Sequence, residues 1–289
     1  MSVEPIPPRH HWPGPASERA GRERTLLSRF APHLLGLLWF ALLAPGLGGC
    51  AAGPLDKVSS SLFTAGYDSF RAAKFADAER QFTQVISRNP GNASLSEVYY
   101  FRGLSRLKLG RREQAKSDFR QGATSYGREL TQIYSAVALA NLEFEESHDK
   151  AAADLYKQAL DHPVKDLPLD AILFRLGVSS QRLGRWQQAD DAFARLVSKY
   201  PESPLAPEAR RRFQASYFTV QAGAFAERKN AEALVDRLKQ KGFPASPTVV
   251  ASQGKTLHLV NVGRYRTYRE AESVAAQLKG QGISVLIRP

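Results

Sequence analysis

A stretch of small and polar residues near the C-terminus has the residue types of a binding surface. The segment TVQAGAF (residues 219–225) has the composition of a β-strand, interrupted by Gln221 and then by Gly223. Because side chains alternate between the two faces of a strand, Val220 and Ala222 share one face, and Gln221 and Gly223 share the other. A glutamine amide donates and accepts hydrogen bonds, and a glycine leaves the backbone accessible. The polar face therefore suits a ligand rich in hydroxyl and amide groups.

Residues that often catalyse reactions form no catalytic pattern in this sequence. The segment QGKT (residues 253–256) is similar to the end of a P-loop, but Val249 stands where that loop needs its first glycine. The patterns HExxH and GxSxG are absent, and the histidines after Cys50 are scattered and not clustered: His148, His162 and His258. Several glutamates crowd one predicted helix and are expected to face solvent: Glu143, Glu145 and Glu146. We therefore expect no catalysis, no cofactor and no metal.

The N-terminal part of the chain has the pattern of an export signal. Residues 34–47 form an apolar run of 14 residues, which is short for a membrane span and typical of a signal sequence. Basic residues precede the run, and LGGC, ending in the single cysteine Cys50, follows it. This arrangement resembles the lipobox of bacterial lipoproteins, although an ordinary inert cysteine is the alternative. The resemblance implies cleavage after residue 49, acylation (as by palmitate) of Cys50, and a lipidated linker over residues 50–58. Ala51 is not aspartate, so the resemblance favours the outer membrane.

The charge balance favours an anionic partner. The formal net charge is +12, and removal of residues 1–49 would leave 35 basic and 25 acidic side chains. The basic excess therefore belongs to the part of the chain that would be exported, where it favours an acidic polymer or an anionic surface.

The middle of the chain contains a repeat with a period of 37 residues. A small residue on each of two predicted helices allows the helices to cross closely, and an aromatic one turn later fills the space beside them. Four sets of positions share this period: Gly66, Gly103, Ala140 and Gly177; Ala73, Gly110, Ser147 and Gly184; Ala78, Ala115, Ala152 and Ala189; Phe82, Phe119, Tyr156 and Phe193. The pattern predicts four helix hairpins, and APEARRRF (residues 206–213) predicts a capping helix.

This pattern resembles the tetratricopeptide repeat over residues 59–203, and with the capping helix the predicted repeat domain spans residues 59–213. The resemblance implies a helical stack with a concave, partner-binding groove lined by the first helix of each repeat. The expected groove residues are Phe63, Tyr67, Tyr100, Tyr134, Asn141 and Phe174. The alternative is that most of these aromatic residues are packed between repeats. The segment KYPESPLAPEAR also resembles repeat junctions of periplasmic lipoproteins in barrel assembly and of the Tol–Pal coordinator.

Residues 214–289 have a different period, which predicts the order βαββαβ. The four predicted strands are YFTVQAGAF, ASPTVVAS, TLHLVNVGRY and ISVLIRP, and two amphipathic helices each end before a glycine. The segments VQAGAF, KNAEALVDRLKQKGFPA, LVNVGRY and the REAE helix resemble the SPOR domain over its whole length. RNA-recognition modules use the same element order, but LHLVNVGRY lacks their exposed aromatics. A regulatory ferredoxin-like domain is a further alternative.

The SPOR resemblance implies a ferredoxin-like sheet that binds peptidoglycan glycan strands stripped of their stem peptides, as at the division septum. Helices would cover one face of the sheet, and the open face would bind glycan. We expect the aromatic rings to stack on sugars and the arginines to pair with the free lactyl carboxylates. The expected glycan-binding residues are Thr219, Gln221, Gly223, Phe225, Leu259, Asn261, Arg264, Tyr265 and Arg266. The alternative for Gln221 is that its side chain only faces solvent, on a face of the sheet that binds no ligand.

Together these patterns predict a multidomain, non-enzymatic protein: an all-α repeat stack followed by a small α+β domain. We expect a lipoprotein at the periplasmic face of the outer membrane, enriched at the septum, that binds denuded peptidoglycan. Its repeats would recruit an unidentified protein partner, and no nucleic acid is expected. The alternative function is an envelope assembly scaffold that acts mainly through its repeats, with the glycan-binding domain as a tether.

Overall fold

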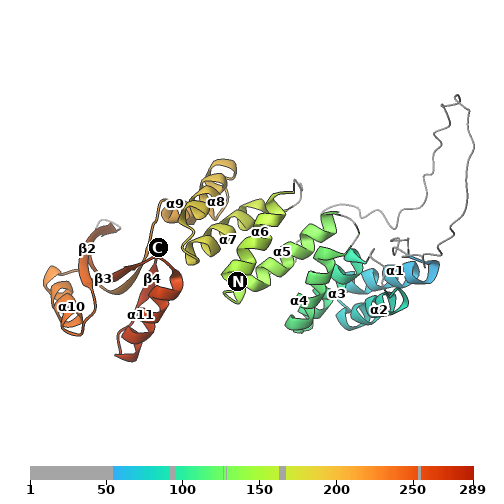
Figure 1. Ribbon diagram of the computed structural model, residues 1–289, viewed down its shortest axis with the longest axis horizontal. Coiled ribbons are helices and arrows are strands. Elements are labelled where there is room, and N and C mark those ends of the chain that lie inside the picture. Colours follow the sequence, from blue (N-terminus) through green and yellow to red (C-terminus); the bar gives the residue numbers. More distant parts are fainter. Residues whose placement is uncertain (1–54, 91–94, 126, 128, 163–166, 253–254) are drawn as a thin grey trace, which may run out of the picture. The chain divides into compact units, whose positions relative to one another are not determined.

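The computed structural model describes residues 55–90, 95–125, 127, 129–162, 167–252 and 255–289 (Figure 1). The predicted signal sequence and the predicted lipidation site Cys50 lie outside these residues. The chain divides into two compact units, with the boundary between Gln132 and Ile133. None of the helices in the described ranges is both long and apolar enough to cross a membrane.

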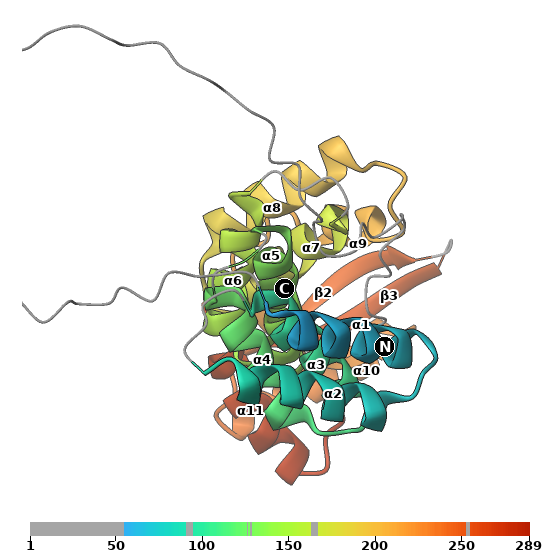
Figure 2. The same cartoon turned by 90° about the vertical axis from the view of Figure 1, so that its right-hand side faces the viewer.

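The first unit consists of helix hairpins. α1 (Lys57–Arg71) pairs with α2 (Phe75–Arg88), and α3 (Ser96–Lys108) pairs with α4 (Arg112–Thr124). Figure 2 shows α1 lying alongside α2. The Asp56 carboxylate begins α1 by accepting a hydrogen bond from the Ser59 amide at 2.6 Å, which satisfies one of the amides left unpaired at a helix N-terminus.

A glycine facing an aromatic ring closes each hairpin of this unit. A Cβ atom added to Gly66 would lie 2.8 Å from the Phe82 ring, and one added to Gly103 would lie 2.7 Å from the Phe119 ring. Phe82 also stacks on Phe101 of the next hairpin, with ring centroids 6.2 Å apart. The aromatic ring of the repeat thus fills space within its own hairpin and, at Phe82, against the following one.

A buried ion-pair cluster adds to the packing of the first unit. The Asp118 carboxylate accepts hydrogen bonds from Arg102 at 2.7 Å and from Arg106 at 2.9 Å, and the Asp118 side chain is 2% exposed. Arg106 also pairs with Glu79 of α2 at 2.9 Å. Burial raises the pKa of the Asp118 carboxyl group, and the two guanidinium groups oppose that shift only in part.

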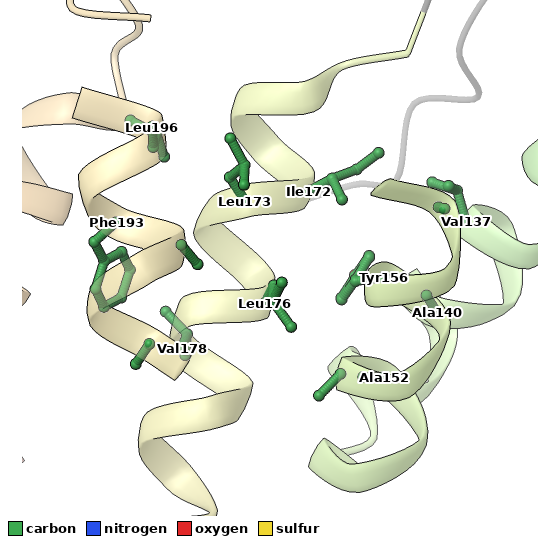
Figure 3. Packing of buried hydrophobic residues seen from close by; sticks show 14 of the residues in the cluster. Val137, Ala140, Ala152, Tyr156, Ile172, Leu173, Leu176, Val178, Phe193 and Leu196 are labelled. Carbon is green, nitrogen blue, oxygen red and sulfur yellow. The ribbon is translucent and has the colours of Figure 1, made fainter. Parts of the chain in front are cut away.

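The second unit begins with more hairpins of the same kind. α5 (Glu129–Glu145) and α6 (Asp149–Leu160) are followed by α7 (Leu169–Arg182), α8 (Trp186–Lys199) and the short α9 (Ala206–Arg212). Figure 3 shows α7 between α8, which carries Phe193 and Leu196, and the α5–α6 pair, which carries Ala140 and Tyr156. The predicted repeat register is confirmed, because the alanine set and the aromatic set are 0% exposed.

The turn between the paired helices has the same backbone conformation in every hairpin. The turn residues have positive φ angles: 56° at Ala73, 74° at Gly110, 61° at Ser147 and 73° at Gly184. This left-handed conformation ends a helix and favours glycine, but two hairpins use other residues there.

The predicted groove residues contribute mainly to packing. Phe63 is 7% exposed and Tyr100 is 8% exposed, so their assignment to an open groove is wrong, and the alternative that they are core residues holds. Tyr67 packs on Phe101 with ring centroids 5.1 Å apart, and Phe174 packs on Phe193 with ring centroids 6.0 Å apart. Tyr134 is partly buried against the core of the second unit.

Asn141 is also engaged within its unit. Its Oδ1 atom accepts hydrogen bonds from the Tyr156 hydroxyl at 2.7 Å and from Arg175 at 2.5 Å. These contacts tie α5 to α6 and α7, which gives Asn141 a structural role.

Residues 218–288 form the predicted βαββαβ arrangement. The elements are β1 (Phe218–Phe225), α10 (Arg228–Gln240), β2 (Ala245–Ser252), β3 (Lys255–Tyr265), α11 (Tyr268–Gly280) and β4 (Leu286–Arg288). The sheet is antiparallel with the strand order β2-β3-β1-β4, so β1 and β3 are the central pair. Thr267 and Glu270 form a capping box that begins α11.

Candidate functional site

The helices cover one face of the sheet and leave the other face open. Val220, Val260 and Val262 are 0% exposed and share one core with Leu238 of α10 and Leu278 of α11. The side chains that alternate with these valines point away from the helices. The buried valines therefore mark the helix side of the two central strands.

A pocket of about 320 Å³ lies on the open face, a volume typical of small-ligand sites. Residues from three strands and their flanking segments line it: Tyr217, Thr219, Pro244, Ser246, Thr248, Asn261, Gly263 and Arg264. Three of the predicted glycan-binding residues, Thr219, Asn261 and Arg264, are therefore brought together.

Hydrogen bonds hold the polar side chains of the pocket in place. The Thr219 hydroxyl donates to the Gly263 carbonyl at 3.0 Å, and the Asn261 amide nitrogen donates to the Thr248 hydroxyl at 3.1 Å. An asparagine amide has a second donor hydrogen and an acceptor oxygen, so this contact leaves capacity for a ligand. The arrangement presents hydrogen-bonding groups of both kinds to the pocket.

The positively charged side chain of Arg264 lies at one end of the pocket. The Arg264 guanidinium lies 4.7 Å from the centroid of the Tyr217 ring, a distance typical of a cation–π contact. Arg264 is exposed, so its guanidinium can also pair with an anionic group of a ligand. The pocket therefore combines neutral hydrogen-bonding groups with one positive charge.

β-Bulges determine which side chains reach the open face. Val220 pairs with Val262 but Phe218 pairs with Tyr265, so Gly263 and Arg264 together oppose the single residue Thr219. Gly263 has a φ angle of 65°, which is the left-handed conformation of a glycine bulge. The extra residue places Arg264 at the pocket and turns Tyr265 to the helix side.

The predicted exposure of Tyr265 on the open face is wrong for this reason. Its ring packs against the core of the domain, and burial raises the pKa of its phenol. A Cβ atom added to Gly263 would lie 2.2 Å from the Tyr265 hydroxyl. The Tyr265 ring therefore occupies the space beside Gly263 that a side chain at residue 263 would need.

A second bulge has the same effect on Phe225. Gln221 pairs with Asn261 and Gly223 pairs with Val260, so β1 has one residue more than β3 between these pairs. A Cβ atom added to Gly223 would lie 2.6 Å from the Phe225 ring and 3.1 Å from Leu234 of α10. Gly223 therefore makes room for a ring on the helix side, and the predicted roles of Gly223 and Phe225 on the open face are wrong.

Gln221 and Leu259 lie on the open face outside the pocket lining. Gln221 pairs with Asn261 across β3 and with Leu286 across β4. Its side-chain oxygen is buried and has no hydrogen-bond partner among the described residues. Leu259 is half-buried opposite Thr248. Together with Leu286, which is 51% exposed, these residues extend the open face beside the pocket.

Arg266 does not belong to the pocket. Its carbonyl accepts a hydrogen bond from the Trp186 indole at 3.1 Å, and its side chain lies near Gly184. The expectation that Arg266 shares the open face with Arg264 is therefore wrong.

Sequence reasoning missed the contribution of β2 to the pocket. Ser246 and Thr248 of β2 line the pocket, and both stand two residues apart on the same face of the strand. The alternation in ASPTVVAS could have identified the β2 residues. Pro247 is compatible with this strand because β2 lies at an edge of the sheet.

The structure also brings together groups that the sequence suggested were separate. Glu143 is 7% exposed and its carboxylate lies 2.6 Å from Nδ1 of His148, so the expectation that Glu143 faces solvent is wrong. The side chains of Glu143, Glu146 and His148 each have one atom that could coordinate a metal ion, and these three atoms lie within 4.8 Å of one another. The contact closes the α5–α6 turn, where the His148 amide donates to the Glu143 carbonyl at 2.9 Å.

Comparison with known families agrees with both parts of the fold. Residues 214–289 match the SPOR domain, and residues 171–203 match the tetratricopeptide repeat. The predicted resemblance to the SPOR domain and to the tetratricopeptide repeat, and the predicted fold class, are thereby confirmed. A SPOR domain indicates peptidoglycan binding and tetratricopeptide repeats indicate protein interaction, and both are non-catalytic binding modules.

Comparison with solved structures gives matches at low identity. The chain is 16% identical to a solved structure of MamA protein, with a TM-score of 0.42 and coverage of 54% of this chain and 88% of that chain. It is 15% identical to a tetratricopeptide repeat protein from Parabacteroides merdae, with a TM-score of 0.46 and coverage of 65% of this chain and 68% of that chain. No curated protein matches the chain.

Proposed function

We propose that the protein binds denuded glycan strands of peptidoglycan through the pocket on the open face of its SPOR domain. The observation that carries this proposal is the pocket itself, which joins Thr219, Ser246, Thr248 and Asn261 to the guanidinium of Arg264. Glycan strands without stem peptides present hydroxyl groups, N-acetyl groups and a free lactyl carboxylate on each muramyl residue. Each of these groups has a complementary partner in the pocket.

The charge of the domain supports an anionic polymer as its ligand. Residues 214–289 contain 11 basic and five acidic side chains. A stem peptide occupies the lactyl carboxylate through an amide bond, so intact strands lack the charge that Arg264 would recognise. The pocket should therefore prefer strands from which the stem peptides have been removed.

The cellular setting belongs to the same proposal. Acylation of Cys50 would hold the protein at the periplasmic face of the outer membrane, since two acyl chains give stable anchoring. Denuded strands occur where amidases act during division, so binding to them would enrich the protein at the septum. The helical repeats would recruit a protein partner to that place.

Co-sedimentation of the full chain with sacculi tests the proposed ligand. Amidase-treated sacculi should retain the protein better than intact sacculi, and Thr248→Glu should abolish the preference by filling the pocket and repelling the carboxylate. Val249→Glu is the matched control, because Val249 is the next residue of the same edge strand, is 62% exposed and points to the opposite face. Equal retention on both kinds of sacculi, or equal loss in the two variants, would reject the proposal.

A further inference from the structure

One turn of the repeats differs from the equivalent turns in what lies beside it. Gly110 and Gly184 occupy the same position of the repeat, with φ angles of 74° and 73°. A Cβ atom added to Gly110 would have no atom within 4 Å, whereas one added to Gly184 would lie 3.0 Å from the Arg266 carbonyl oxygen. The other hairpins have Ala73 and Ser147 at this position, so the turn itself accepts a side chain. The close approach of the SPOR domain is therefore what requires glycine at residue 184.

Trp186, two residues after this glycine, packs on the SPOR domain. Its ring centroid lies 5.0 Å from that of Phe218, which in turn lies 5.6 Å from that of Tyr268. The indole nitrogen donates a hydrogen bond to the Arg266 carbonyl at 3.1 Å. Trp186 thus contacts both the first residue of β1 and the segment that follows β3.

Arg182 makes a second contact from the same hairpin. Its guanidinium lies 5.3 Å from the centroid of the Phe144 ring and 5.4 Å from that of Tyr268. It also pairs with Asp149 at 3.3 Å, and the Asp149 side chain is 13% exposed. Since two rings and a carboxylate hold the guanidinium, its position against the SPOR domain is well defined. We call the contact of Arg182, Gly184 and Trp186 with Phe218, Arg266 and Tyr268 the joint.

Two short segments, residues 217–218 and residues 264–266, contribute both to the joint and to one end of the pocket. Tyr217 lines the pocket and is followed by Phe218, which packs on Trp186; Arg264 lines the pocket and lies two residues before Arg266. Phe218 and Tyr265 are the last paired residues of the β1–β3 ladder at this end. The ladder therefore does not reach Tyr217, and the joint holds the backbone on either side of the Tyr217–Arg264 contact.

We propose that Trp186 is a positioning residue for the ligand pocket: the last repeat holds the Tyr217–Arg264 end of the pocket in its binding geometry. This inference rests on the proposed function, because the ligand is the denuded glycan strand. By linkage, a joint that favours the binding geometry is itself stabilised when the ligand binds. Ligand binding on the open face should thus be sensed by Trp186 on the helix side.

The full chain with Trp12→Phe and Trp39→Phe provides the test, because Trp186 is then its only tryptophan. Addition of denuded strands from amidase-treated sacculi should change the fluorescence emission of Trp186. The midpoint of this change should lie at the same strand concentration as the midpoint of the binding curve. Trp186→Ala in the unmodified chain should weaken binding about fivefold or more, the size of a typical coupling between sites. Trp186→Phe keeps a ring for Phe218 but loses the N–H donor, so it should restore binding in part.

A matched pair of glycine variants separates the joint from general damage to the repeats. Gly184→Ser and Gly110→Ser both introduce the residue that Ser147 places at this turn, but only Gly184→Ser meets Arg266. Gly184→Ser should weaken binding as Trp186→Ala does, and Gly110→Ser should bind as the unchanged chain does. Equal binding by all variants with unchanged emission would overturn this inference and leave the proposed function intact. Equal losses in the two glycine variants would also overturn it, whereas failure of the unchanged chain to bind would reject both proposals.

Discussion

Arg264 is the residue on which the proposed selectivity of the pocket for denuded strands depends. The pocket otherwise offers neutral groups, which any polysaccharide could satisfy. A charge-assisted hydrogen bond is stronger than a neutral one and contributes about 1.5–3 kcal/mol. A stripped muramyl residue has a free lactyl carboxylate where a substituted one has an amide bond to the stem peptide. The partner of that lactyl carboxylate should therefore decide the preference.

Replacement of Arg264 by alanine should therefore weaken binding to denuded strands about tenfold or more, since about 1.4 kcal/mol corresponds to a factor of ten. Binding isotherms at low and moderate ionic strength would measure the effect, which salt should reduce. Arg237→Ala is the control, because Arg237 is an exposed arginine of α10 on the helix side. A similar loss in both variants would indicate attraction by net charge alone.

The residue scale is also where prediction from sequence failed. The sequence correctly placed Thr219 and Asn261 on the open face. It failed at Phe225 and Tyr265, because each lies beyond a bulge that shifts the alternation by one residue. A bulge depends on the pairing of two strands, which neither strand encodes alone.

At the scale of elements, the hairpins depend on close packing between a glycine and an aromatic ring. A Cβ atom added to Gly177 would lie 2.5 Å from Cε1 of Phe193. The 37-residue period made the positions predictable from sequence, because small and aromatic residues recur in one register. The groove could not be predicted in the same way, since an aromatic on a first helix can face either a neighbouring helix or solvent.

Gly177→Ala should destabilise the protein by about 1–3 kcal/mol, because overpacking outweighs the gain in helix propensity. Phe193→Leu in the same chain should relieve the overlap, giving a coupling of at least about 0.5 kcal/mol in a double-mutant cycle measured by chemical denaturation. Gly280→Ala is the control, because that helical glycine has open space beside it. Additive effects of the two core substitutions would contradict the predicted contact.

The buried ion pairs of the first unit should contribute more to the free energy of unfolding than its exposed ion pairs do. Asp118→Ala leaves Arg102 and Arg106 without the carboxylate between them, and removing one partner of such a buried cluster costs about 3–5 kcal/mol. Asp77→Ala breaks an exposed pair with Arg80 and should cost at most about 1 kcal/mol. Comparable losses of the free energy of unfolding in the two variants would show that burial does not determine the contribution of these pairs.

In the full-length protein, the proposed lipid anchor and the proposed glycan-binding pocket belong to different parts of the chain. Cys50→Ala should prevent acylation, and the mature protein should then leave the outer-membrane fraction or remain uncleaved. Fractionation with mass spectrometry of the N-terminus measures this outcome. A mature protein that stays in the outer membrane with an N-terminus at another residue would contradict the lipoprotein prediction.

The SPOR domain should direct the protein to the septum. Removal of residues 214–289 should abolish septal enrichment, and Thr248→Glu should do so without removing the domain. Fluorescence microscopy of tagged chains measures the enrichment, with Val249→Glu as the control. An unchanged distribution in the truncated chain would instead favour the repeats as the part that determines location, as in the assembly-scaffold alternative.

An NMR titration of the full chain with denuded strands would show whether the open face of the SPOR sheet is the glycan-binding surface, as we propose. Backbone amide shifts should change most along Tyr217–Gln221, Ser246–Thr248 and Asn261–Arg264, with smaller changes at Trp186. Shift changes confined to the exposed surfaces of α10 and α11, or to the repeats, would contradict the claim.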